Sequence, residues 1–411
     1  MILLAMAGGL LTGQPTTPAL PYSRTPALSD SAVQITLLTM GQGGQVYELF
    51  GHNAIWVRDP VTGIDSVYNW GVFDFRSEGF LVRFLQGDMR YTMDSQTIDY
   101  TLRYYRHFNR RIWAQELDLT PSEKRAIVDY IQWNSRPENR QYRYNYYLDN
   151  CSTRVRDILD RAVGGQLRTY LRAIPTDQTY RGHSLRLMQS TPLLVTGVDM
   201  ALGRSTDIPL NADQASFLPV ELMNYLRNFK VDGGRRSLVA REYTFSDAER
   251  GPEPANVPAL WKVFLPIGLV FAAIILGFWF GLHSRVATAT VVAILAGVIG
   301  IVGLIILLLV TVTDHVAAHG NENMWMLNPI WLVVAVALPI ALFKQRWKVA
   351  RWATLAGAAF SLGAVLMHLV GLSRQANWDV IALLLPVQLA MALLVLRYRA
   401  PARRVSEVGS A

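Results

Sequence analysis

The only cysteine in the chain, Cys151, stands in the stretch YNYYLDNCSTRVRDIL. Asp149 and Asn150 before it are residue types that cap helix N-termini, so we expect Cys151 in the first turn of a helix. Unpaired backbone N–H groups and the helix dipole at that position stabilise a thiolate, and the same N–H groups can serve as an oxyanion hole. A single cysteine excludes an internal disulfide and a multi-cysteine metal site. The alternative interpretation is a small core residue, which the polar neighbours disfavour.

A thiolate nucleophile needs a base, and the first 260 residues hold the histidines His52, His107 and His183. His52 follows a glycine-rich turn and begins a predicted strand, which suits an exposed base. His107 and His183 are flanked by arginines, which favours a structural or surface role. Each of the three can also be an ordinary hydrogen-bonded side chain.

A third residue would hold the imidazole ring in place. Asn69 lies on the strand predicted after the His52 strand, and it can face His52 if the two strands pair antiparallel. The alternatives in the same region are Asp59, Asp65 and Asp74. The competing interpretation of Asn69 is a residue that bonds a turn or the backbone.

Residues from about 33 to 240 have the pattern of an α+β domain that would position these side chains. Thr120, Pro121 and Glu123 together form the N-terminal signature of a helix that runs to about Asn134. The helix that carries Cys151 is expected to end before Gly164 and Gly165. The other predicted elements are a helix at 80–84 and strands at 33–39, 52–57, 65–70 and 111–119.

The second half of the chain has the composition of a membrane domain. The whole protein is 51% hydrophobic and only 17% charged, where a soluble domain carries about 25% charged residues. Five apolar segments follow Trp261, each close to the roughly 20 residues that a membrane helix needs. They are predicted at 261–281, 286–312, 325–343, 352–372 and 378–396.

The charge pattern predicts how these segments are oriented. The chain from Trp261 onward holds 11 Lys and Arg against 4 Asp and Glu, while the first 260 residues hold 28 and 27. The membrane half therefore carries a surplus of 7 of the net charge of +8, and the basicity does not indicate nucleic acid. Most of these cations lie after the first, third and fifth segments, so we expect those linkers to be cytoplasmic and the globular domain to lie outside. Five tryptophans lie near the segment ends, which fits anchoring at the membrane interface: Trp261, Trp325, Trp331, Trp352 and Trp378. Simple packing would also explain their positions.

Two further features remain from the sequence. The polar stretch TDHVAAHGNENMWMLNP between the second and third segments holds Asp314, His315 and His319. This stretch could be a solvated loop, or it could bind a metal, for which two histidines and one aspartate are a small ligand set. We favour a third interpretation, in which it shapes a lipid entrance. The first 13 residues, MILLAMAGGLLTG, have the apolar core of a secretory signal or an anchor.

Several motifs resemble one family. GHNAIWVRD, VYNWGVFDF, FLQGDMRY, SRPENRQYRYNYYLDNCSTRVRDIL and FLPVEL, spread over about 33–230, are similar to the Lnb-type periplasmic domain of bacterial lipoprotein N-acyltransferases. They also resemble the permuted papain-like group that includes NlpC-type peptidases and lecithin:retinol acyltransferase.

The resemblance implies a permuted papain-like (NlpC-type) α+β fold followed by an all-α transmembrane domain of about five helices. It implies a Cys151 nucleophile and a His52 base, with Asn69 as third member. It also implies transfer of a phospholipid acyl chain, through a Cys151 thioester, to the N-terminal amino group of a diacylglyceryl-cysteine lipoprotein. Substrate contacts are expected from Asn150, Tyr68, His315 and His319.

The alternatives are an NlpC-type cell-wall or peptide hydrolase and a non-enzymatic membrane protein. No phosphate-binding loop signature occurs, and we expect neither a cofactor nor a metal, nor nucleic acid as a partner. The expected partners are phospholipid, lipoprotein and the bilayer, in the bacterial inner membrane with a periplasmic catalytic domain and a cytoplasmic C-terminus. The expected divisions are a signal-like segment and linker at 1–32, a thiol-enzyme domain at 33–250, a linker at 251–260, a transmembrane domain at 261–400 and a cytoplasmic tail at 401–411.

Overall fold

The computed structural model describes residues 32–398. The predicted N-terminal segment (apart from residue 32) and the predicted tail lie outside the described residues. The chain forms two compact units. The N-terminal unit runs to Asp199 and adds Thr206–Pro258 and Thr313–His315, whereas the C-terminal unit holds Met200–Ser205, Ala259–Val312 and the chain from Val316 onward.

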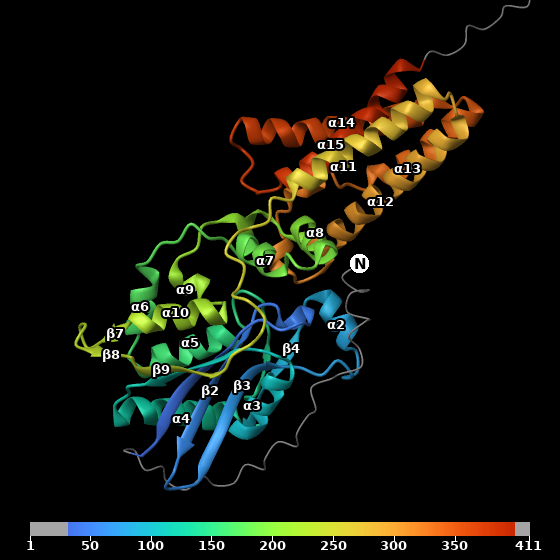
Figure 1. The fold of residues 1–411 in the computed structure, drawn as a ribbon. Coiled ribbons are helices and arrows are strands. Elements are labelled where there is room, and N and C mark those ends of the chain that lie inside the picture. Colours follow the sequence, from blue (N-terminus) through green and yellow to red (C-terminus); the bar gives the residue numbers. More distant parts are fainter. Residues whose placement is uncertain (1–31, 399–411) are drawn as a thin grey trace, which may run out of the picture. The chain divides into compact units, whose positions relative to one another are not determined.

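A seven-stranded antiparallel sheet organises the N-terminal unit (Figure 1). Its spatial order is β6-β4-β3-β2-β1-β5-β9. The strands in chain order are β1 (Gln34–Met40), β2 (His52–Asp59), β3 (Ile64–Val72), β4 (Arg90–Thr97), β5 (Ile112–Leu117), β6 (Gln141–Arg143) and β9 (Val239–Ser246). The strands predicted near β1, β2, β3 and β5 are confirmed, whereas β4, β6 and β9 were not predicted.

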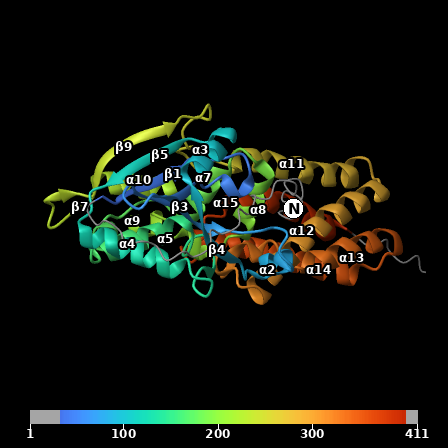
Figure 2. The ribbon, with the colours of Figure 1, turned by 90° about the horizontal axis from the view of Figure 1, so that it is seen from below.

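Helices cover both faces of the sheet because alternate strand residues are apolar on each side. Ile35 and Leu37 of β1 face one core cluster together with α4 (Pro121–Asn134) and α5 (Cys151–Ala162). Figure 2 shows these two helices side by side along the sheet. Leu38 and Met40 of β1 belong to a second cluster, against which residues of α3 (Ile98–His107) pack.

Local signals set the helix ends. The predicted capping box of α4 is present, because the Thr120 side chain accepts from the Glu123 backbone N–H while the Glu123 carboxylate bonds the Thr120 N–H. The remaining elements of this region are α2 (Phe80–Gln86), α6 (Gln166–Arg172), α7 (Tyr180–Met188), α8 (Pro192–Ala201), α9 (Ala212–Ala215), α10 (Pro219–Asn228), β7 (Lys230–Val231) and β8 (Arg236–Ser237).

The C-terminal unit contains five helices long and apolar enough to cross a membrane, which confirms the predicted number among the described residues. They are α11 (Trp261–Leu276, extended by a π turn at Gly277–Gly281), α12 (Arg285–Val312), α13 (Ile330–Lys344, preceded by a 3-10 turn at Glu322–Trp325), α14 (Trp347–Leu369) and α15 (Trp378–Arg397). α14 begins earlier than the predicted residue 352. Helix α15 lies between α11 and α14, as Figure 1 shows.

Close packing of these helices corrects one expectation. Trp331 is fully buried, and a Cβ added to Gly357 would lie 2.8 Å from its indole ring. Because Gly357 of α14 has no side chain, the indole ring of Trp331 on α13 can lie between the two helices at that point. Trp331 is therefore a core residue of the C-terminal unit, and the prediction that it anchors the protein at the membrane interface is wrong.

Candidate active site

Cys151 is the first residue of α5, as the capping signal predicted. Asn150 has extended backbone geometry, and its side-chain oxygen accepts from the backbone N–H groups of Ser152 and Thr153, each at 2.9 Å. The Asn150 amide nitrogen donates to the carbonyls of Tyr146 and Phe217, each at 2.9 Å. These bonds tie the start of α5 to two loops and hold the partly buried Cys151 in a fixed backbone geometry.

His52 and Asn69 meet on neighbouring strands. β2 and β3 pair antiparallel with Ala54 opposite Asn69, so Asn69 is the diagonal neighbour of His52 on the same sheet face. The His52 Nε2 atom lies 3.1 Å from the Asn69 side-chain oxygen. The His52 ring also stacks on Tyr105 from α3 at a centroid distance of 6.5 Å.

The hydrogen bonds of Asn69 set the protonation pattern of His52. The Asn69 amide nitrogen donates to the Val67 carbonyl at 3.2 Å, which turns the amide oxygen toward His52. An amide oxygen only accepts, so Nε2 of His52 must carry the proton that it donates. In the neutral ring, Nδ1 then keeps the lone pair that a general base requires.

A second pair of side chains links β2 to α5 beside the candidate pair. Asn53 follows His52, and Ser152 follows Cys151. The Asn53 amide donates to the Ser152 hydroxyl at 3.0 Å, and that hydroxyl donates to the Ser216 carbonyl at 2.7 Å. Both side chains are buried, so this bridge fixes the start of α5 against the start of β2.

A glycine provides the close approach of β3 to Cys151. Gly71 has φ +88° at a register shift of β3, and a Cβ there would meet the Tyr144 ring at 3.5 Å and the Cys151 Cβ at 3.8 Å. Positive φ at this value is costly for residues with a side chain. The bulge thus brings the β3 backbone close to the Cβ atom of Cys151.

Burial dominates the electrostatics of both candidate groups. Burial lowers the pKa of His52 to about 4, although its hydrogen bond to Asn69 acts in the opposite direction. Burial also raises the pKa of the Cys151 thiol, against the backbone N–H groups of Asn53 and Ser152 that favour the thiolate. The backbone N–H groups at the start of α5 thus favour the thiolate, as expected, but burial outweighs them, and both groups are neutral near pH 7.

Arg110 is a feature of this site that sequence reasoning missed. Its side chain is only 4% exposed and pairs with the equally buried Glu48 at 3.3 Å. The guanidinium lies 4.7 Å from the centroid of the Tyr105 ring. Its charge lowers the pKa of both His52 and Cys151. In the sequence it stands among other arginines, and nothing there shows that this one is buried.

The remaining predicted site residues lie in different surroundings. Tyr68 precedes Asn69 on β3, so its side chain lies on the sheet face opposite to Asn69, where it packs against the same core cluster as Cys151. Asn150 is used as the cap of α5. In the N-terminal unit, the Nε2 atom of His315 lies 3.0 Å from the Phe84 carbonyl, whereas His319 is exposed in the C-terminal unit. Contact of these four residues with substrate stays a prediction.

The other aspartates and the histidine considered as candidate site residues bond to other partners. Asp59 bonds its own turn, Asp65 accepts from the Trp56 indole, and Asp74 accepts from the Arg76 backbone. His183 is buried, and its Nδ1 atom accepts from Arg186 at 3.1 Å. Within residues 32–398, no group of three His, Cys, Asp or Glu side chains is arranged to hold a metal ion.

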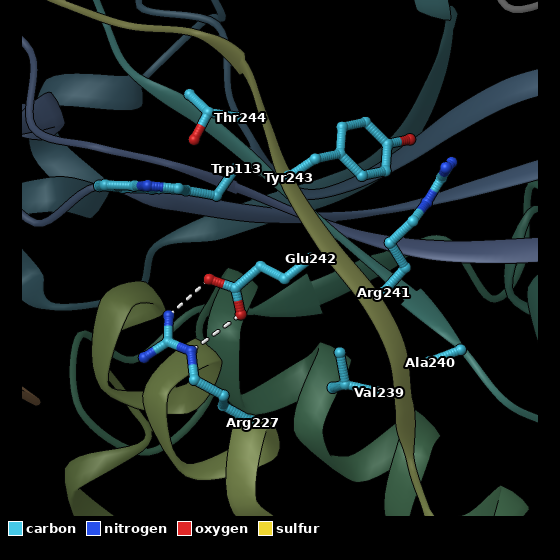
Figure 3. Close-up of a pocket in the computed structure, with 8 residues that line it drawn as sticks. All are labelled: Trp113, Arg227, Val239, Ala240, Arg241, Glu242, Tyr243 and Thr244. Atoms are coloured by element: carbon cyan, nitrogen blue, oxygen red, sulfur yellow. Dashed lines mark hydrogen bonds and ion pairs between the residues drawn. The ribbon is translucent and has the colours of Figure 1, made fainter.

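A surface hollow of about 480 Å³ lies along the edge strand β9. Figure 3 shows it beside the paired side chains of Arg227 and Glu242, which meet at 2.6 Å. None of the residues predicted to carry chemistry lines it. The hollow therefore has no part in the arrangement around Cys151.

A sheet-rich domain followed by five membrane-length helices defines a membrane protein with a folded N-terminal domain. Two family models match the chain: the Lnb N-terminal periplasmic domain over residues 24–184 and the Lnb transmembrane domain over residues 260–400. The chain belongs to the Lnb-type family, with a multi-span membrane domain after a periplasmic one. This membership indicates a lipoprotein-processing membrane enzyme. No curated protein and no solved structure matches the chain.

Proposed function

We propose that the protein is a lipoprotein N-acyltransferase that carries the acyl chain on Cys151. The donor is a membrane phospholipid, and the acceptor is the N-terminal amino group of a diacylglyceryl-cysteine lipoprotein. The observation that carries the proposal is the His52–Asn69 hydrogen bond in a family-matched domain whose only cysteine begins a capped helix. In this proposal the domain has the permuted papain-like arrangement, in which a strand histidine precedes the helix cysteine.

The first half-reaction forms the thioester. The Cys151 sulfur attacks the ester carbonyl carbon while Nδ1 of His52 takes the thiol proton, so the buried neutral pair becomes charged only as the bond forms. The backbone N–H groups of Cys151 and Asn53 point at the thiol and are the candidate donors to the oxyanion. When the ester C–O bond breaks, His52 returns the proton to the leaving oxygen, and a lysophospholipid departs.

The second half-reaction restores the thiol. The lipoprotein amino group attacks the thioester carbonyl, His52 accepts a proton from the nitrogen, and the C–S bond breaks to form the amide. The proton then passes to the Cys151 sulfur. Because both half-reactions use one sulfur, the kinetics should be ping-pong.

Aromatic side chains near Cys151 support an acyl chain as the substrate group. Phe84 and Phe80 stack along α2, and the series of ring contacts continues through Phe73 and Tyr91 to Tyr144. Tyr144 lies beside Gly71 and the Cys151 Cβ position. The outer face of α2 exposes the apolar residues Leu81, Val82 and Leu85. In our proposal the acyl chain enters at this face of α2 and lies along the series of rings.

The membrane half fits substrates that stay in the bilayer. Transfer of an acyl chain out of lipid costs about 0.8 kcal/mol for each CH₂ group, so the enzyme has to act at the surface. In our proposal the C-terminus lies in the cytoplasm, which is supported by the odd number of membrane-length helices after a periplasmic domain and by the basic residues after α13 and α15.

The test uses full-length protein in detergent with a labelled phospholipid and a diacylglyceryl lipopeptide. Wild type should form a hydroxylamine-sensitive acyl adduct and add a third acyl chain to the lipopeptide. Cys151→Ala should do neither, and His52→Gln should lose about 10²–10⁴-fold in rate because the base is missing. The exposed His107→Gln is the matched control and should keep the wild-type rate.

Hydrolysis of a peptide or cell-wall fragment without any acyl adduct would overturn the proposal in favour of the NlpC-type alternative. Formation of the adduct by Cys151→Ala would overturn the assignment of the nucleophile. Asn69→Ala should slow thioester formation while retaining donor binding, because the amide orients His52 rather than contacting lipid.

A further inference from the structure

The C-terminal unit contains a cavity of about 120 Å³ that the proposed chemistry does not use. Its polar walls come from Arg204, Glu322, His368 and Ser373, and its apolar walls include Trp325 and Met367. The cavity lies where α14 ends and α15 begins, beside the turn that precedes α13. Charged groups within a membrane domain are costly unless they have a function, so this cluster requires an explanation.

Buried amides hold the floor of the cavity rigid. The Asn377 side chain donates to the Asn323 side-chain oxygen at 2.9 Å, and its own oxygen faces Nε2 of His368 at 2.6 Å. Asn321 and Asn323 both donate to the Met200 carbonyl, at 2.8 Å and 3.0 Å. Ring contact with Trp378, at a centroid distance of 4.6 Å, fixes the His368 ring from the other side. Such a network keeps the lining groups in position for a ligand.

The charges are arranged with the anion inside and the cation at the mouth. The Glu322 side chain is 15% exposed, and that of Arg204 is 63% exposed. The Ser373 hydroxyl donates to one carboxylate oxygen of Glu322. The other oxygen lies 3.9 Å from the Arg204 guanidinium, which is too long for a direct hydrogen bond. The partly buried carboxylate therefore forms an ion pair with Arg204 without a direct hydrogen bond between them, and both groups line the cavity.

We propose that this cavity binds the headgroup of a phospholipid that carries a primary ammonium group. The ammonium would donate to Glu322 and the Ser373 oxygen beneath the Trp325 ring, and the phosphate would pair with Arg204 at the mouth. The cavity holds about four water volumes, enough for an ammonium and its short linker but not for a long acyl chain.

The side of the membrane also fits this ligand. The end of α14 and the start of α15 lie on the same side as the N-terminal domain if each helix crosses once. The inference rests on the proposed function, because the bound lipid would be the acyl donor. The same ammonium chemistry could come from the α-amino group of the lipoprotein, and the experiment has to separate the two sources.

The binding test uses full-length Cys151→Ala protein, which cannot turn the lipid over. Native mass spectrometry and thermal stability would compare short-chain phosphatidylethanolamine, phosphatidylcholine and phosphatidylglycerol with identical acyl chains. We expect the ethanolamine lipid to bind at least tenfold more tightly than the choline lipid, whose methyl groups remove the N–H donors. Glu322→Gln should abolish this preference, and Arg204→Gln should weaken both lipids. The exposed Arg374→Gln is the matched control and should change neither.

Equal binding of the ethanolamine and choline lipids, or a preference that survives Glu322→Gln, would overturn the proposal. Competition by a lipopeptide with a free α-amino group, without any binding of the ethanolamine lipid, would overturn the phospholipid assignment. Ser373→Ala gives a second readout if Glu322→Gln fails to fold, and it should reduce the preference in the same direction. The acyl-transfer assay on wild type is separate, so headgroup selectivity without any thioester would refute the proposed function alone.

Discussion

Replacing Asn150 by alanine removes the cap of α5 and tests whether that cap holds Cys151 in place. The Asn150 side chain makes two bonds to the helix N–H groups and two to the carbonyls of Tyr146 and Phe217, all at 2.9 Å. Loss of the cap costs about 1 kcal/mol. Each buried carbonyl that loses its donor adds about 1 kcal/mol, for a total loss of about 3 kcal/mol. In a unit of this size, that loss lowers the Tm by roughly 6–12 °C.

The assay can use the chain's only cysteine as its reporter. A thiol-reactive fluorophore labels Cys151 as the start of α5 opens on heating, and tryptophan fluorescence provides an independent transition. Asn150→Ser retains an acceptor at the cap but loses the two amide donors, so its Tm should fall by roughly 4–8 °C. The exposed Asn228→Ala is the matched control and should stay within about 2 °C of wild type.

Two results would refute this reasoning. If Asn150→Ala unfolds at the same Tm as wild type, the capping bonds contribute nothing measurable to the stability of the N-terminal unit. Equal losses for the alanine and serine variants would mean that the acceptor at the cap has no effect and that only the two carbonyl bonds count.

Three further predictions follow from the geometry. Because burial lowers the pKa of His52 to about 4, below the usual 6.5, this group contributes stability at neutral pH that is lost as the pH falls from 6.5 to 4. His52→Gln should therefore show a smaller drop in Tm between pH 7 and pH 4.5 than wild type, and an equal drop would contradict the assignment. Because burial raises the pKa of the Cys151 thiol, its alkylation by iodoacetamide should be slow at pH 7 and still be rising above pH 9. A plateau already reached at pH 7 would indicate a resting thiolate instead. In α12, a Cβ at Gly303 would lie 2.7 Å from the Leu327 backbone, whereas at Gly297 the nearest atom is 3.9 Å away, so Gly303→Ala should lower the detergent Tm and Gly297→Ala should not.

The sequence predicted those helices and strands that are determined by residues within the same segment. Thr120 and Glu123 bracket the start of α4 within one turn, and Asn150 caps α5 in the same way. The five apolar segments are long enough to be recognised by composition alone. In contrast, β9 becomes a strand through pairing with β5, more than 120 residues earlier in the chain, and no local pattern contains that partner.

The same distinction applies to the candidate site. The sequence placed His52 and Asn69 on consecutive strands, but their contact depends on the register that sets Ala54 opposite Asn69. Burial of the Cys151 thiol depends on how the sheet, α5 and the tyrosines pack, so the sign of its pKa shift could not be read from the helix terminus alone. The polar stretch before α13 suggested a lipid entrance or a metal. In the structure, Asn321 and Asn323 in it bond backbone carbonyls of the C-terminal unit.

The hydrogen bond between Asn53 and Ser152 joins the residues that directly follow His52 and Cys151. This bond holds the start of β2 against the start of α5, and neither the His52 nor the Cys151 side chain takes part in it. In the proposed reaction the sulfur would gain and lose an acyl group, and the imidazole a proton, while this hydrogen bond stays intact. Under that proposal alignment and reactivity belong to different residues, so Cys151→Ser and Cys151→Ala should both retain the alignment of strand and helix.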